Sequence, residues 1–407
     1  MNNPPQTHDL MIVFDAVTCG TFGTGALKEA ISDIINFAAL VNCFERIGVI
    51  AYRNYACTPE KVVEWSGWCY PSRDPEDPDP GYPSTDDTLR FVKTLEMPAA
   101  NGYELNCASK TALAKAYQEM RSNGTIILLY TLAPPMLEHI RRDHYDLELY
   151  KSEQMTLPEY GEKGHLFRNW INGANTLAGL TSDKKAVVLS FSLGIHDNLR
   201  DWSPYLYLSV ATGGELYRTN YTSVSRLTIS LLLTWMQADG NIDIPQAFRT
   251  AYKGDPTLFH WACEANMGVF CGLNRGNLEV FDTHTTPRNR LRVPYGGASN
   301  NNQQLNRFTS ENLAKTYIDS SVWYKNAIAR HISRIIRTNV SVLAIHPIFQ
   351  RLWVTVCMDR TGSKIKRTLK QKFEDQVLRI SDDEDKRQAQ AWLDEADTIL
   401  HEIDEEI

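Results

Sequence analysis

The feature that most constrains the fold is a recurring alternation between short, unbroken apolar runs and longer segments with helical periodicity. Residues 10–14 form the first apolar run, and a glycine-containing loop and a helical pattern over residues 26–40 follow it. Further apolar runs, each expected to be a strand, cover residues 46–52, 125–131 and 186–191. Unbroken apolar strands suit a sheet that is covered on both faces. Strands that alternate with helices therefore predict an α/β fold with a doubly wound, mostly parallel sheet.

Helical patterns separate these strands, at residues 108–121, 166–180 and 222–237. In a doubly wound sheet, ligands bind in the crevice outside the carboxyl ends of the strands. The loops that follow Phe14, Tyr52 and Tyr130 are therefore the places where a functional site is expected.

The alternation weakens after Gly240, and we expect a domain boundary there. Residues 9–240 form the expected α/β unit, and residues 241–407 a second region that is mixed or helical. Within the first unit, residues 72–87 hold four prolines among acidic residues, a composition that disfavours both helix and central strand. This stretch is therefore expected to be an exposed loop insertion.

Charge is divided unevenly within the second region. Residues 325–372 hold eleven Lys or Arg and one acid, Asp359, whereas residues 373–407 hold thirteen acids and three bases. The basic segment and the acidic helical tail are therefore expected to pair with each other. The whole chain has a net charge of −7, so nucleic acid is an expected partner only if residues 325–372 are left unshielded.

Targeting signals are not evident in the sequence. The polar N-terminus leads into an apolar run that is too short for a signal peptide, and no apolar stretch approaches the roughly 18 residues of a membrane span. The eight cysteines include no CxxC pair of the kind that binds zinc. We therefore expect reduced thiols, no membrane partner, and a location in the cytoplasm or the nucleus.

Five blocks of sequence together resemble the von Willebrand factor A (vWA) family, in particular its intracellular fungal-type members. They are LMIVFDA at 10–16, RIGVIAYRNY at 46–55, SKTALAKAY at 109–117, LLYTLAPP at 128–135 and YLSVATGGELY at 207–217. Their order and spacing agree with the family over roughly residues 9–240, somewhat more than half of the chain. The resemblance implies a Rossmann-like fold with a metal-ion-dependent adhesion site at the carboxyl ends of its strands.

The first loop of that implied site departs from the family. There, a DxSxS loop, a threonine or acid from a second loop and an aspartate from a third supply oxygen ligands to a hard cation such as magnesium. Asp15 keeps the first position, but Val17 and Cys19 stand in place of the two serines. A carbon atom and a soft sulfur do not replace hydroxyl oxygens for such an ion.

The other two loops depart as well. Leu132 stands where the third loop has its aspartate, and only Asn101 or Glu104 offers oxygen from the second loop. A one-residue shift that placed Thr18 and Thr21 in the first loop would restore hydroxyl oxygens but not the missing carboxylate. The site is therefore expected to be degenerate and to hold no metal cofactor, with residual magnesium binding as the alternative.

Two further features allow more than one interpretation. The loop at residues 19–25 has its glycines in the order GxxGxG rather than the nucleotide-binding order GxGxxG, and no Lys-Ser or Lys-Thr pair follows. The aromatic residues Trp65, Trp68 and Tyr70 fit either internal packing or a binding surface.

The function expected from the sequence is a non-catalytic scaffold that binds an unidentified protein partner through the vestigial metal site. The residues expected to line that site are Asp15, Val17, Cys19, Thr21, Asn101, Glu104 and Leu132. No GxSxG or HExxH motif is present, and the ten histidines show no spacing typical of metal ligands. The alternatives are a nucleotide-binding or hydrolytic enzyme that uses the loop 19–25, and a metal-dependent vWA ligand-binding domain.

Overall fold

A six-stranded sheet forms the centre of the protein in the computed structural model. The structure describes residues 8–17, 24–71, 82–97, 107–121, 124–133, 135, 144–193, 199–219, 221, 223–236, 310–344, 347–359, 363–381 and 383–405. The strands are β1 (His8–Asp15), β2 (Phe44–Tyr52), β3 (Val63–Cys69), β4 (Thr125–Thr131), β5 (Ala186–Ser192) and β6 (Leu216–Arg218). All four strands that the apolar runs predict are confirmed, to within two residues at each end.

The strand order is β3-β2-β1-β4-β5-β6, and every neighbouring pair is parallel except β2 and β3. This is the order of a doubly wound sheet, in which the chain runs outward in one direction from β1 and then returns to β4 to run in the other. The predicted α/β class with a mostly parallel, Rossmann-like sheet is therefore confirmed.

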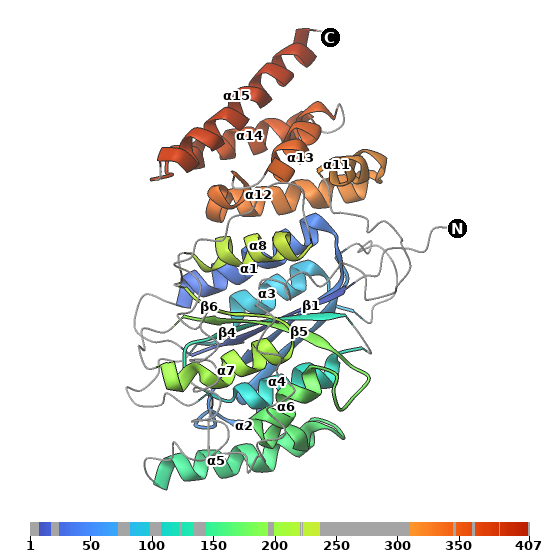
Figure 1. Cartoon of the computed structure of the whole chain (residues 1–407). Helices are drawn as coiled ribbons and strands as arrows, with labels where there is room; N and C mark the ends of the chain where they lie inside the picture. Colours follow the sequence, from blue (N-terminus) through green and yellow to red (C-terminus); the bar gives the residue numbers. More distant parts are fainter. Residues whose placement is uncertain are drawn as a thin grey trace, which may run out of the picture.

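Helices cover both faces of the sheet, as Figure 1 shows. One face carries α1 (Thr24–Val41), α3 (Thr85–Thr94) and α8 (Val224–Trp235). The other carries α4 (Ser109–Glu119), α6 (Trp170–Leu177) and α7 (Leu199–Ala211), with α2 (Pro59–Val62) and α5 (His144–Thr156) farther out. Two short 3-10 turns, η2 (Leu157–Glu159) and η3 (Gly164–Arg168), connect α5 to α6.

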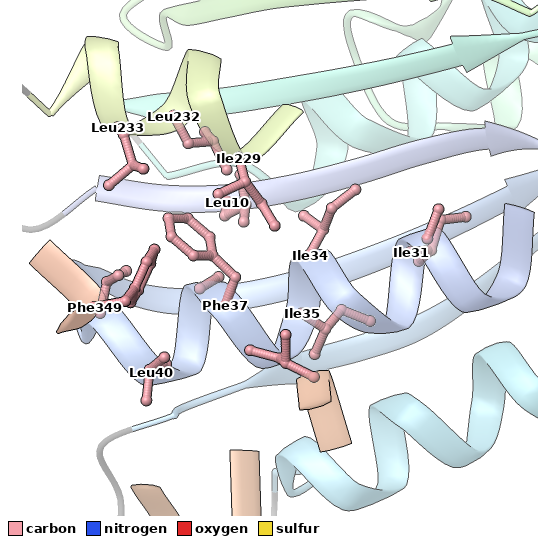
Figure 2. Close-up of a cluster of buried hydrophobic side chains, with 14 of the residues drawn as sticks. Leu10, Ile31, Ile34, Ile35, Phe37, Leu40, Ile229, Leu232, Leu233 and Phe349 are labelled. Atoms are coloured by element: carbon pink, nitrogen blue, oxygen red, sulfur yellow. The ribbon is translucent and has the colours of Figure 1, made fainter. Parts of the chain in front are cut away.

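Strand β1 shows why its apolar run is unbroken. Leu10, Ile12 and Phe14 point into the core beneath α1 and α8, whereas Met11 and Val13 point into the core beneath α4. Figure 2 shows Leu10 among the side chains of α1 and α8. Because side chains alternate between the two faces of a strand, a strand buried on both faces must be apolar at every position.

The edge strand β3 was not predicted, although it contains the aromatic residues noted in the sequence. Trp68 is buried, Trp65 is half-buried, and their rings meet edge to face at 5.2 Å. Val49 N–H donates to Ser66 Oγ (2.9 Å) at an irregularity in the pairing of β2 and β3, and Gly67 next to it has φ +77°. The aromatic pair is therefore mainly internal packing, and the irregular strand gives a poor template for edge-to-edge pairing.

The prediction that residues 72–87 form a loop is wrong at its C-terminal end, where residues 85–87 are helical. Helix α3 begins at Thr85, because Ser84 and Asp87 form a reciprocal capping box in which each side chain accepts the other's backbone N–H. The last proline of the stretch, Pro83, lies before this cap and leaves the helix free to start. Residues 72–81 lie outside the described part of the chain.

The described part of the second region, from residue 310 onward, is helical. It consists of α11 (Ser310–Asp319), α12 (Val322–Ala344), α13 (Pro347–Met358), α14 (Ser363–Val377) and α15 (Asp383–Glu405). These helices stack on α1 and α8 (Figure 1), and one continuous apolar core extends from the sheet into them. Phe37 of α1 and Phe349 of α13 meet at 5.8 Å across this junction. The predicted boundary at residue 240 therefore does not separate the hydrophobic core into two.

Polar contacts also fasten the helical region to the sheet unit. His331 Nδ1 lies 2.9 Å from Asn36 Oδ1, and Arg334 pairs with Asp86 at 2.8 Å. Within the helical region, Lys370 of the basic segment forms an ion pair with Asp397 of the acidic segment. In the part of the chain that the structure describes, no helix combines the length and apolar character needed to cross a bilayer.

Candidate functional site

The topological switch point lies between β1 and β4, where the carboxyl ends of the two strands stand side by side. Asp15 is the last residue of β1, and Leu132 follows directly after β4. The backbone continues the pairing past the strand ends, since Ala16 N–H donates to the carbonyl of Tyr52 (2.7 Å) and Leu193 N–H to that of Thr131 (2.9 Å). Asp15 therefore lies at the position in the topology where doubly wound proteins bind ligands.

Asp15 is enclosed, with only 1% of its surface exposed. Its Oδ1 accepts a hydrogen bond from Val17 N–H (3.2 Å), and the backbone N–H of Leu132 donates to the same carboxyl group. Burial raises the pKa of Asp15 to about 7, because it outweighs the lowering by these two hydrogen bonds and by the charge of Arg53. The carboxyl group therefore titrates near neutral pH.

Leu132 and Cys107 are two of the described residues that lie near Asp15. Leu132 and Cys107 are both 3% exposed. Cys107 Sγ lies 3.4 Å from the hydroxyl oxygen of Tyr205 and 3.5 Å from the carbonyl oxygen of Ala133. Burial, and to a lesser extent the charge of Asp15, raises the pKa of the Cys107 thiol to about 12. At neutral pH this thiol is protonated, so it is a poor nucleophile and a poor metal ligand.

Tyr205 of α7 joins the end of β4 to the start of α4. Its buried hydroxyl lies 3.0 Å from the carbonyl oxygen of Ala133, 3.1 Å from Ser109 Oγ and 3.2 Å from Thr131 Oγ1. Thr131 also donates to the Ala133 carbonyl at 2.7 Å. The network fixes the end of β4 against the first turn of α4. Burial raises the pKa of Tyr205 well above its usual value, which keeps the phenol neutral.

Arg53 holds the loop after β2 in place from inside the protein. Its side chain is 1% exposed and pairs with Glu64 of β3 at 2.5 Å. It also donates to the backbone carbonyls of Lys61 (2.6 Å) and Glu96. Its own carbonyl accepts from Ala108 N–H at 2.9 Å, directly before α4. Arg53 is therefore a positioning residue that ties three segments to the carboxyl edge and lends positive charge to Asp15.

Three described residues near Asp15 offer no oxygen ligand from their side chains to a hard divalent cation. Magnesium takes several oxygen ligands, whereas Val17, Cys107 and Leu132 offer carbon, a protonated thiol and carbon. Within the described ranges no group of three or more His, Cys, Asp or Glu is placed to hold a metal. The predicted site residues Cys19, Thr21, Asn101 and Glu104 lie outside those ranges.

The structure brings together three of the predicted site residues, Asp15, Val17 and Leu132. It also places Cys107, Ser109 and Arg53 at the same edge, and sequence reasoning did not assign these to the site. A signal was available for two of them, because Arg53 and Ser109 fall within blocks that resemble the vWA family. Tyr205 could not have been found, since only the packing of α7 brings it to β4.

Fold and site together define a class: a doubly wound, Rossmann-like α/β protein with a buried carboxyl group, Asp15, at its topological switch point. No protein-family model matches the chain. Over 239 residues the chain is 27% identical to a protein named as an ariadne-like RING finger protein (R811) of Acanthamoeba polyphaga mimivirus. The similarity covers 57% of this chain and 20% of that relative, so the chain spans about one fifth of the relative's length.

Proposed function

We propose that residues 9–240 form a vWA-type domain that binds a protein partner at the carboxyl edge of its sheet without a metal ion. The observation that carries the proposal is the environment of Asp15, a buried carboxyl group with a pKa near 7 that is enclosed by Leu132 and the neutral thiol of Cys107. A carboxylate that serves a cation needs further oxygen ligands beside it. Here Val17, Leu132 and Cys107 offer carbon or a protonated thiol instead.

The location of the five vWA-like blocks supports the proposed class. In chain order they fall on β1, β2, α4, β4 and the end of α7 with β6. Each block thus coincides with a strand or helix that contributes to the carboxyl edge or to the core beneath it. Similarity that follows the architecture in this way is what a shared domain would produce.

The relative that is named for a RING finger points to a function other than a scaffold, unless the similarity lies outside its RING module. RING modules bind zinc through closely spaced cysteines and histidines, and this chain has no CxxC pair. We infer that the similarity lies in a part of that relative other than such a module. We propose that the shared part is a recognition domain, which in the relative is joined to further segments that this chain does not match.

Site-specific cross-linking in cells tests the proposed binding edge. A photo-reactive amino acid at Ala56, an exposed position in the loop after β2, should capture a defined partner. The matched control is Lys185, an exposed position at the opposite, amino-terminal edge next to β5. Capture from Ala56 should persist in EDTA. Equal capture from both positions, or loss of capture in EDTA, would contradict the proposal.

Calorimetry tests the metal-free part separately. Titration of the full chain with Mg²⁺ or Mn²⁺ should show no stoichiometric binding that depends on Asp15. Tight binding that disappears in Asp15→Ala would establish the metal-dependent alternative. The nucleotide alternative predicts thermal stabilisation instead, about 2.7 kcal/mol at a ligand concentration 100 times Kd. A clear shift with ATP, GTP or NAD would therefore favour that reading.

A further inference from the structure

The outward side of α12 is basic over two helical turns. Arg330, Arg334 and Arg337 are spaced four and three residues apart, which places them on one side of the helix. Arg330 and Arg337 are exposed, and Arg334 is half-buried. The opposite side of α12 belongs to the apolar core through residues such as Ile332 and Ile336. No Asp or Glu occurs anywhere in α12, so no acid of the same helix offsets these charges.

The neighbouring helices α14 and α3 add one further cation and one acid. Helix α12 packs against α14 (Figure 1), and exposed Lys372 of α14 donates from Nζ to Ser333 Oγ of α12 at 3.0 Å. Asp86 of α3 pairs with Arg334 at 2.8 Å. Although burial would raise the pKa of Asp86, Arg334 and Arg330 hold it below the usual value. A basic surface of four cations, Arg330, Arg334, Arg337 and Lys372, therefore has one charged acid beside it among the described residues that contact it.

The acidic helix α15, which the sequence suggested as a shield, pairs with a different side of α14. Asp397 of α15 forms an ion pair with Lys370. Lys370 and Lys372 lie two residues apart, so they face different sides of the helix. Within the described ranges, Arg330, Arg337 and Lys372 form no ion pair. The condition under which the sequence allowed a nucleic-acid partner, an unshielded basic segment, is met on this surface.

The chemistry of the basic surface fits a phosphate backbone better than a protein interface. Protein interfaces have an apolar centre, and among the described residues the exposed large apolar side chains of α12 and α14 are Val322 and Leu378, both more than a turn away. Arg330 and Arg337 are about 10 Å apart along the axis at about 1.5 Å per residue. A line of arginines, whose planar guanidinium groups match phosphate oxygens, suits a polymer with a repeating negative charge.

We propose that Arg330, Arg334, Arg337 and Lys372 bind the phosphate backbone of a nucleic-acid duplex without reading its sequence. A duplex is preferred to a single strand because no exposed aromatic ring of α12 or α14, among the described residues, offers a platform for unpaired bases. The net charge of −7 provides no general attraction, so binding depends on these four side chains. The inference goes beyond the proposed function, since this surface belongs to the helical region and not to the carboxyl edge of the sheet.

Fluorescence anisotropy of the full chain with labelled 20-base-pair DNA and RNA duplexes tests the surface. Four neutralised phosphates predict a slope of log Kobs against log salt concentration of about −3.6, at about −0.9 for each. The double variant Arg330→Gln/Arg337→Gln should weaken binding at least tenfold in low salt and reduce the slope to about −1.8. The matched control, Lys185→Gln/Lys315→Gln, removes the same charge at exposed positions elsewhere and should bind as the wild type does.

Binding to either duplex with these properties would support the proposal. Binding to neither duplex in low salt, or an equal loss of affinity in both double variants, would overturn it. Poly-glutamate should displace the labelled duplex at least tenfold less effectively, per charge, than unlabelled duplex does. Equally effective displacement would assign the surface to acidic protein segments and would also overturn the proposal.

Discussion

Asp9 and Asp15 lie near opposite ends of β1, and their surroundings shift their pKa values in opposite directions. Burial alone would raise the pKa of Asp9, but hydrogen bonds from Arg46 and Arg121 outweigh it and hold the pKa below the usual value. Among the described residues, Asp15 has backbone donors from Val17 and Leu132 and a more distant cation, Arg53, so burial prevails and its pKa rises to about 7. One strand therefore carries a permanently charged carboxylate at its amino end and a protonatable one at its carboxyl end.

Asp15→Asn should remove a pH-dependent destabilisation of the fold. The raised folded-state pKa of Asp15 means that the fold favours the protonated carboxyl group. The contribution of the protonated carboxyl group to stability is therefore lost as pH rises from about 4 to 7. The free energy of unfolding of the wild type should therefore fall relative to Asp15→Asn across this range. The difference is on the order of 3 to 4 kcal/mol at about 1.4 kcal/mol per pKa unit. Urea denaturation of both proteins at several pH values measures it.

Asp9→Asn provides the matched control with the opposite sign. The lowered pKa of Asp9 stabilises the fold at neutral pH, and this stabilisation is lost as pH falls below about 4. The variant should be destabilised at pH 7 and approach the wild type in acid. If Asp15→Asn followed the same pattern, Asp15 would be a charged, paired carboxylate, and the metal-free reading of the site would lose its support.

At the scale of elements, the contact between α12 and α1 contains the buried histidine His331. Burial and the neighbouring charges of Arg334 and Arg330 lower its pKa to about 4, and Asp86 opposes them only in part. Its Nδ1 lies 2.9 Å from Asn36 Oδ1 on α1. The neutral ring is therefore the form that the packed helices accept.

Acid should weaken this helix contact before it affects the sheet. A lowered histidine pKa means that its stability contribution is complete above pH 6.5 and is lost as pH falls toward 4. The loss is on the order of 3 kcal/mol. The hydrogen-exchange protection factors of the α12 amides, which correct for the intrinsic pH dependence of exchange, should fall over this range in the wild type. His331→Gln, which keeps an amide donor for Asn36, should show a much smaller change, and an equal change in both would assign the effect to another group.

The bend in edge strand β3 depends on Gly67. Its φ of +77° is a conformation that side chains disfavour by about 1 to 2 kcal/mol, and an added Cβ would lie 3.0 Å from Pro83 Cγ. Gly67→Ala should therefore lower the free energy of unfolding by at least that amount.

Gly25→Ala is the control variant. Gly25 in α1 has open space around it, so this substitution should raise the free energy of unfolding by about 0.5 to 1 kcal/mol. Thermal melts compare the two, and equal effects would show that the bend carries no strain.

At the scale of the whole molecule, the shared core predicts that the sheet and the helical region unfold together. Phe349 is 2% exposed and packs against Phe37 across the junction. Phe349→Ala should cost about 3 to 5 kcal/mol and lower the midpoint of a single calorimetric transition. Met358→Ala, on the same helix but 58% exposed, should have little effect. Two separate transitions, with only one moved by Phe349→Ala, would show instead that the two regions are independent.

The agreement between sequence and structure varies with how local each signal is. Strand β4 was predicted at its observed bounds, since a strand buried on both faces leaves an unbroken apolar run. Strand β3 was missed because Glu64, Ser66 and Gly67 interrupt its pattern, and an edge strand needs no unbroken run. At the site, the sequence located Asp15 and Leu132 at strand ends but gave no reason to join them to Tyr205, which is more than 70 residues from both.

What the sequence determined by itself is therefore the doubly wound class and the absence of a carboxylate at Leu132. Both follow from the residue type at a single position or from a local period. Only the tertiary structure decided that the second region shares the sheet's core, that Cys107 contacts Tyr205, and that Glu153 neutralises Lys110. These contacts join segments distant in sequence, and the free energy that selects them comes from burial and charge pairing, which no local pattern records.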